Sequence, residues 1–138
     1  MIKVLFLCVG NAARSQMAEG FARFLADDKI EAFSAGSKPA GLVDTLAIQT
    51  MKEKNIDISS HQSKGFDKIP ASEFDYVVGM DCGDTCPVVH TKQYIQWDIP
   101  DPNGKTIKEF RKVRDEIEQK IDDFIQLVVN NNIIKERK

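Results

Sequence analysis

The sequence has no long hydrophobic segment, only three cysteines and almost no excess of either charge. No apolar run approaches the ~20 residues that a helix needs to cross a bilayer. The first residues, Met1-Ile2-Lys3, lead directly into an apolar run, without the small-residue cleavage site of a secretory signal. We therefore expect a cytoplasmic protein that has no membrane partner.

The charge of the chain is nearly balanced. Its 138 residues include 19 basic and 21 acidic side chains, which gives a net charge of −2. Proteins that bind nucleic acids through the phosphate backbone carry a basic surplus, so we expect no nucleic-acid partner, while a small anion in a confined site remains compatible. The length suits one domain spanning residues 1–138 without repeats or linkers, and we expect a monomer.

The three cysteines do not suit a structural role. An odd number cannot form the disulfide framework typical of small secreted proteins. In a reducing compartment, such residues are better candidates for chemistry than for crosslinks. The positions of Cys8, Cys82 and Cys86 therefore indicate where a reaction takes place.

Four short apolar runs alternate with segments of helical periodicity. The runs predict strands at residues 2–7, 30–34, 76–80 and 94–97. Helical spacing of apolar residues predicts helices after Ser15, from Asp44 to Lys54 and after Thr106, the last ending at the asparagines of residues 130–132. Residues 56–70 have no clean period, and we expect a loop with a short helical turn there.

This alternation predicts an α/β fold, a three-layer sandwich in which helices flank a four-stranded parallel sheet. Ligands in such folds bind beyond the carboxyl ends of the strands. The loops that carry Cys8, Cys82 and Asp101 each follow a predicted strand, so we expect them to meet at one edge. His61 lies in the irregular segment and is interpreted as a loop histidine that is hydrogen-bonded to nearby backbone.

The segment from Cys8 to Ser15 is the predicted reaction centre. A cysteine between a strand and a helix lies near unpaired backbone N–H groups and the positive end of the helix dipole, which favours the nucleophilic thiolate. Gly10 and Asn11 tolerate left-handed backbone angles, so that successive amides can form a nest for an oxyanion. The guanidinium of Arg14 matches two oxygens of a phosphate-like anion, and the Ser15 hydroxyl can donate a hydrogen bond to the sulfur. The alternative is that Cys8 is only a small core hydrophobe.

The motifs carry a family resemblance. Cys8 and Arg14 separated by five residues, with Ser15 next and Asp101-Pro102 late in the chain, resemble the low-molecular-weight tyrosine phosphatase fold. A wider match to the thioredoxin-coupled arsenate reductases built on that fold consists of Gly10-Asn11, Arg14-Ser15-Gln16-Met17-Ala18-Glu19-Gly20-Phe21, Ser34-Ala35-Gly36, Ile56-Asp57-Ile58-Ser59, Cys82 with Cys86-Pro87, Trp97, and Phe110-Arg111-Lys112-Val113-Arg114-Asp115-Glu116-Ile117.

The resemblance implies a reaction and its residues. Cys8 would attack arsenate, Asp101 would protonate the departing oxygen, and Cys82 would then attack Cys8 to release arsenite. Cys86 would resolve that disulfide, and thioredoxin would reduce the final Cys82–Cys86 bond, in a role in arsenical resistance. The oxyanion-binding residues would be Val9, Gly10, Asn11, Ala12, Ala13, Arg14 and Ser15. Asp98 competes for the role of acid, but Asp101 is preferred because the family pattern is Asp-Pro.

Two departures from the family pattern concern binding. Ala12-Ala13 stand where Ser-Cys is common, but the nest uses backbone, so we expect oxyanion binding to survive. No cofactor is expected to be required. Some such reductases bind a potassium ion, and Asn11, Glu19 and Ser34 match its ligands, whereas Gln62 stands where a Thr is usual.

Two other functions remain open. A low-molecular-weight protein tyrosine phosphatase would share Cys8, Arg14, Ser15 and Asp101, and a weak phosphatase activity is expected in either case. However, Asn103-Gly104 follow the Asp-Pro pair where such phosphatases tend to carry aromatic residues. A metal-binding module is the third reading, because Cys82, Cys86 and His90 recur at every fourth residue and offer three zinc ligands.

Overall fold

The computed structural model describes residues 1–69, 73–80 and 90–137, and of His90 and residues 130–137 it describes the backbone alone. The elements in chain order are β1 (Ile2–Cys8), α1 (Arg14–Leu25), β2 (Ile30–Gly36), α2 (Thr45–Lys52), the 3-10 helix η1 (Phe66–Lys68), β3 (Glu73–Gly79), β4 (His90–Gln96) and α3 (Ile107–Arg137).

The four strands form one parallel sheet in the order β2-β1-β3-β4. This confirms the predicted α/β class and the four-stranded parallel sheet. The strands end together, because Cys8 pairs with Gly36, and Gly79 pairs with both Leu7 and Gln96. The loops that follow β1 and β2 therefore leave the sheet at the same edge as the loop that follows β4.

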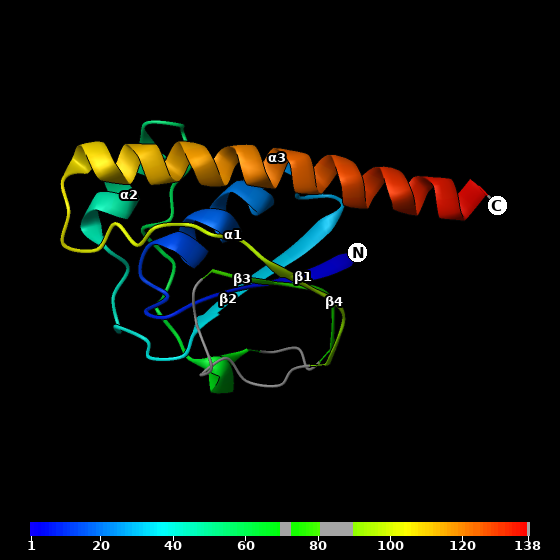
Figure 1. Ribbon diagram of the computed structural model, residues 1–138, viewed down its shortest axis with the longest axis horizontal. Helices are drawn as coiled ribbons and strands as arrows, with labels where there is room; N and C mark the ends of the chain where they lie inside the picture. Colours follow the sequence, from blue (N-terminus) through cyan, green and yellow to red (C-terminus); the bar gives the residue numbers. More distant parts are fainter. Residues whose placement is uncertain (70–72, 81–89, 138) are drawn as a thin grey trace.

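Among the described residues, three α-helices lie on one face of the sheet, and η1 lies on the other (Figure 1). Side chains of β1 alternate between two cores. Val4 and Phe6 pack in the large core that α1 and α3 cover, whereas Leu5 and Leu7 pack in a smaller core with Phe66 of η1 partly buried against it. A strand buried on both faces reads as a continuous apolar run, which is why β1 is so clear in the sequence.

The third helix is longer than the sequence indicates. α3 runs to Arg137 and projects beyond the sheet (Figure 1), so the prediction that the asparagines at 130–132 end it is wrong. Asparagine costs only a few tenths of a kcal/mol in a helix already formed, and neither Gly nor Pro follows to stop it. β3 and β4 likewise begin earlier than predicted, at Glu73 and His90. Among the described residues, no helix is long and apolar enough to cross a membrane.

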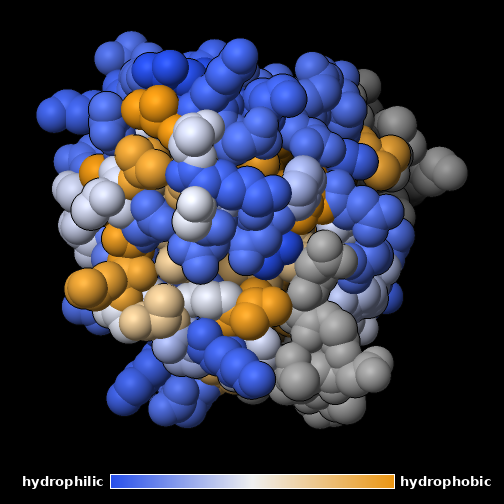
Figure 2. All heavy atoms as spheres, turned by 60° about the vertical axis from the view of Figure 1, so that its left-hand side comes forward, coloured by the Kyte–Doolittle hydropathy of each residue, from blue (hydrophilic) through white to orange (hydrophobic). Residues whose placement is uncertain are grey.

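The visible surface around α2 is mostly hydrophilic, with hydrophobic residues in small separate groups (Figure 2). Large exposed hydrophobic side chains in the described part of the chain are Met1, Phe24, Leu25, Leu42, Tyr94 and Leu127. Single exposed apolar residues of this kind are normal on a folded protein.

A buried arginine joins α2 to α3. Arg114 of α3 is 7% exposed, and its Nη1 donates to the carbonyl of Thr50 at 3.0 Å and to the carboxylate of Glu53. The Thr50 carbonyl belongs to the last turn of α2, where backbone acceptors lack partners within the helix. Arg111 reaches the same carboxylate from the exposed side, and its hydrogen bond is the main reason that the pKa of Glu53 is below its ordinary value.

Replacing Arg114 by alanine should destabilise the fold. The change leaves the Thr50 carbonyl without its donor, so we expect Arg114→Ala to lower the free energy of unfolding by about 1–3 kcal/mol. Urea denaturation measures this loss. The matched control is Arg111→Ala, which removes an exposed partner of the same carboxylate and should cost clearly less. Equal losses in the two variants would contradict the role given to the buried carbonyl.

Candidate active site

The loop of residues 9–13 turns its carbonyls away from Cys8. The carbonyl of Cys8 and three loop carbonyls accept backbone hydrogen bonds from the segment after β2, in the pairs Ser37 N to Cys8 O, Lys38 N to Val9 O, Ala40 N to Gly10 O and Asp44 N to Ala12 O, at 2.8–3.2 Å. In a trans peptide the N–H points opposite to the C=O of the same unit, so the next residues' N–H groups point the other way. The N–H of Asn11 does so and donates to Cys8 Sγ at 3.3 Å.

Asn11 and Ser15 fix the surroundings of the sulfur. Asn11 is fully buried and has a left-handed φ of 48°, a conformation that Asn adopts more readily than most residues. Its Nδ2 donates to Ser15 Oγ at 2.7 Å, and Ser15 Oγ lies 2.9 Å from Cys8 Sγ. Because Ser15 accepts from Asn11, its own proton is available to the sulfur. The buried Cys8 sulfur therefore lies beside two groups that can donate to it, the Asn11 N–H and the Ser15 hydroxyl.

Arg14 and Asp101 lie together beside the loop. Arg14 begins α1 and is buried; its Nη1 donates to the Ile99 carbonyl at 3.1 Å, and its Nη2 lies 3.6 Å from Asp101 Oδ2. The Asp101 side chain is 51% exposed and accepts a hydrogen bond from the Asn103 N–H. Asp98 is exposed and lies outside the cavity described next. The geometry thus brings Asp101, and not Asp98, to the predicted anion site.

A small cavity of about 80 Å³ opens above the cysteine. It is lined by Cys8, Gly10, Ala12, Ala13, Arg14, Ala40, Asp44, Asp101 and Asn103. These lining residues include no aromatic side chain. A cavity of this size holds only a few water molecules, so it suits a tetrahedral oxyanion better than a large ring.

Residues 61–64 brace the loop from the other side, which the sequence analysis did not anticipate. Gln62 O accepts from Gln16 Nε2, Ser63 Oγ donates to Gly10 O, and Lys64 N donates to Asn11 Oδ1, all at 2.8–2.9 Å. The sequence separation of these pairs is 46 or 53 residues. No local pattern could reveal them, because nothing in residues 61–64 is periodic or motif-like.

His61 does not make the contact predicted for its ring. Its Nδ1 lies 3.0 Å from Gln16 Oε1, a side-chain partner on α1, whereas backbone was expected. Burial is the main cause that lowers the pKa of His61 below its ordinary value; the charges of Arg23 and Lys64 lower it further, and that of Glu19 opposes them. His61 is therefore mainly neutral at pH 7.

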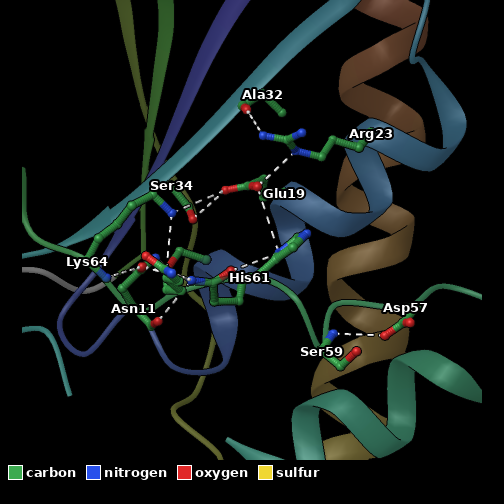
Figure 3. Close-up of polar contacts among 12 residues, drawn as sticks. Asn11, Glu19, Arg23, Ala32, Ser34, Asp57, Ser59, His61 and Lys64 are labelled. Atoms are coloured by element: carbon green, nitrogen blue, oxygen red, sulfur yellow. Dashed lines mark hydrogen bonds and ion pairs between the residues drawn. The ribbon is translucent and has the colours of Figure 1, made fainter. Parts of the chain in front are cut away.

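Glu19 forms a buried charge cluster beneath the loop (Figure 3). It is 3% exposed, and Ser34 Oγ donates to its Oε1 at 2.6 Å. Arg23 Nε donates to Oε2 at 2.9 Å, and Lys64 Nζ lies 3.8 Å from Oε1. Because His61 is mainly neutral, the arginine and the lysine supply the positive charge that this carboxylate needs.

These residues do not fit a potassium site. Asn11 Oδ1 already accepts hydrogen bonds from Gln16 Nε2 at 2.8 Å and from Lys64 N at 2.9 Å, which uses both of its lone pairs. The ammonium of Lys64 lies 3.8 Å from Oε1 of Glu19, an oxygen of the expected ligand set. The expected ligand set of Asn11, Glu19 and Ser34 is thus engaged by groups of the chain itself.

Cys82 and Cys86 lie outside the described residues, as does the side chain of His90. The redox role and the zinc-binding alternative that the sequence suggests for them therefore stay predictions. The described chain before them ends at Met80, whose N–H donates to Leu7 O at 2.7 Å, one residue before Cys8.

Comparison with known proteins gives consistent matches over almost the whole chain. The family model described as low molecular weight phosphotyrosine protein phosphatase matches residues 3–136. Arsenate reductase 2 of Staphylococcus saprophyticus is 42% identical over 124 residues, which cover 88% of this chain and 94% of that protein.

Solved structures agree with these matches. An arsenate reductase in the phosphate binding state has a TM-score of 0.82 and 36% identity, covering 91% of this chain and 97% of that one. A thioredoxin-dependent arsenate reductase of Corynebacterium glutamicum has a TM-score of 0.80 and 30% identity, covering 95% of this chain and 63% of that one.

The end of β2 passes close to the cysteine loop at Gly36. A Cβ at Gly36 would lie 2.5 Å from Val9 O and 2.9 Å from Asn11 N, both backbone atoms, so Gly36→Ala must displace the loop. We expect phosphate affinity, measured by calorimetry, to fall by about 10–100-fold.

Gly20→Ala is the control for this variant. The new Cβ would press on side-chain atoms of Ile58 and Met51, away from the loop. It should change the melting temperature but leave phosphate affinity intact. If Gly36→Ala binds phosphate as tightly as the unchanged protein, the loop does not depend on this approach.

Proposed function

The chain belongs to the family of low molecular weight phosphotyrosine protein phosphatases, and within this family we propose that it is an arsenate reductase that takes electrons from thioredoxin. The observation that carries the proposal is a buried cysteine with two hydrogen-bond donors at the base of an anion-sized cavity, in a chain that holds two further cysteines after β3. Its support from relatives is that proteins named arsenate reductases match nearly its whole length.

The first step forms a bond between sulfur and arsenic. Arsenate binds to the loop N–H groups and the Arg14 guanidinium, which stabilise its negative charge. The Cys8 thiolate attacks arsenic(V), and one As–O bond breaks. Asp101, 3.6 Å from Arg14, gives a proton to the departing oxygen, which leaves as water. The first product is a covalent Cys8–arsenic(V) adduct.

The second step reduces arsenic. The Cys82 thiolate attacks Cys8 Sγ, so that an S–S bond forms and the S–As bond breaks. The electron pair of the broken bond stays with arsenic, which leaves as arsenite. The Cys86 thiolate then attacks Cys82 Sγ and frees the Cys8 thiolate. The dithiol of thioredoxin reduces the Cys82–Cys86 disulfide by two electrons and completes the cycle.

This relay uses protein thiols alone, so no bound cofactor is required for it. It works only where thiols are kept reduced, and on that ground we propose that the protein acts in the cytoplasm.

The second candidate function is a phosphatase. It would share the first step and then use water to release Cys8. Asn103 at the rim of the cavity offers a phosphotyrosine ring no stacking partner, which favours a small oxyanion as substrate. We therefore propose phosphatase activity as a weak side reaction.

Replacing the nucleophile should separate binding from turnover. In Cys8→Ser the loop amides and Arg14 remain, so phosphate should still bind, as titration calorimetry would report. Arsenate reduction should fall by at least about 10³-fold, because a serine hydroxyl is a far weaker nucleophile than a thiolate. Retained turnover in this variant would remove Cys8 from the mechanism.

Replacing Cys82 should separate reduction from hydrolysis. Cys82→Ser should keep the hydrolysis of p-nitrophenyl phosphate, which uses Cys8 but neither of the distal cysteines, and lose multiple-turnover reduction of arsenate. The assay is NADPH oxidation with arsenate, thioredoxin and thioredoxin reductase. Full reduction by Cys82→Ser would rule out the relay. Faster turnover of the unchanged protein with glutathione and glutaredoxin would instead contradict thioredoxin as the donor.

A further inference from the structure

Two cationic side chains, those of Arg23 and Lys64, approach the Glu19 carboxylate from opposite sides. Arg23, which lies on α1 like Glu19, donates to Oε2 of Glu19. It also donates to the carbonyl of Ala32 and so links α1 to β2. Lys64 faces Oε1 from the segment that braces the loop, and its Nζ also donates to Gln62 O at 3.3 Å. Figure 3 shows the lysine side chain reaching towards Glu19 from the loop side.

Lys64 is tied by its backbone to two parts of the site. Its N–H donates to Asn11 Oδ1 at 2.9 Å, and its carbonyl accepts from Gly36 N at 2.9 Å. The side chain is 23% exposed, so part of its solvation is lost where it faces the carboxylate. A displacement of Lys64 therefore acts directly on Asn11, the residue that donates to both Cys8 and Ser15.

The ammonium of Lys64 lies 3.8 Å from Glu19 Oε1 and 3.3 Å from Gln62 O. It carries one positive charge and lies against a carboxylate oxygen and a backbone carbonyl oxygen, the ligand types that hard cations take in proteins. Asn11 Oδ1, another oxygen of the expected ligand set, is engaged by two N–H donors. An added ion would have to displace the lysine and would meet repulsion from it.

We propose that the ammonium of Lys64 is a built-in cation: it neutralises Glu19 beneath the loop, holds Asn11 in position under Cys8 and makes the site independent of potassium. Lys64 is a positioning residue that acts through Asn11. The inference rests on the proposed role of Cys8 but not on arsenate as substrate, so it is tested on phosphate binding and on the alkylation of Cys8.

The test compares charge and space at residue 64. Lys64→Ala removes the charge and leaves room for an ion, whereas Lys64→Met removes the charge and keeps the length of the side chain. Lys64→Arg keeps the charge. Lys68→Met is the control, because Lys68 is an exposed lysine four residues further along. All are made with Cys82→Ser and Cys86→Ser, so that iodoacetamide reports on Cys8 alone.

Each protein is measured in choline chloride and in potassium chloride at equal ionic strength. We expect the parent protein and Lys68→Met to give the same alkylation rate and phosphate affinity in both salts. In choline chloride, Lys64→Ala and Lys64→Met should lose about threefold to tenfold in both quantities. Potassium should restore much of the loss in Lys64→Ala only, and Lys64→Arg should retain most of both quantities.

Three outcomes would overturn the proposal. The parent protein could gain from potassium relative to choline, which would mean that it binds the ion. Lys64→Ala and Lys64→Met could match the parent in choline chloride. The loss in Lys64→Ala could persist in potassium, as expected if the lysine served only to pack the segment. If the Lys64→Ala protein does not fold, the parent comparison and Lys64→Met still decide, and arsenate turnover enters none of these readouts.

Discussion

The site depends on one residue held in an uncommon conformation. Asn11 turns the loop with a φ of 48°, gives its N–H to Cys8 Sγ and its side-chain amide to Ser15, and accepts two donors on its Oδ1. Backbone strain of this kind persists only where the surroundings fix it. Here Asn11 is held by two donors to its Oδ1. One is the side-chain amide of Gln16 on α1, and the other is the backbone N–H of Lys64 in the segment of residues 61–64. The surroundings of the sulfur are therefore fixed by a network of hydrogen bonds rather than by one neighbour.

The parallel sheet explains why distant segments can supply that network. The strands end at one edge, so the loop after β1, the segment after β2 and the loop after β4 meet there. Gly36, at the end of β2, lets the chain pass within contact distance of the cysteine loop. Asp101 arrives from β4 beside Arg14. Gly36 thus contributes a close approach of the backbone, and Asp101 contributes a carboxylate beside the guanidinium.

Sequence reasoning identified candidate site residues that a short motif contains. The spacing of Cys8 and Arg14 could be interpreted because the two residues flank one short loop, and Asp101 is distinguished from Asp98 because a proline follows it. The contacts of residues 61–64 with the cysteine loop and α1 could not be predicted. Their hydrogen bonds join residues 46 or 53 positions apart, and the segment has no periodicity. The asparagines at 130–132 do not end α3, because continuing a helix that has already formed costs little even at residues of low helix propensity.

The built-in cation also explains how the loop can remain rigid without an ion. A mobile ion stabilises a site only while its concentration exceeds its dissociation constant, so its contribution varies with the solution. A lysine on the same chain is always present, and its cost is the side-chain entropy lost when Nζ is held at Glu19. Because the backbone of Lys64 is already fixed by Asn11 and Gly36, only the side chain remains to be ordered. The charge beneath Cys8 is thus set by the fold itself.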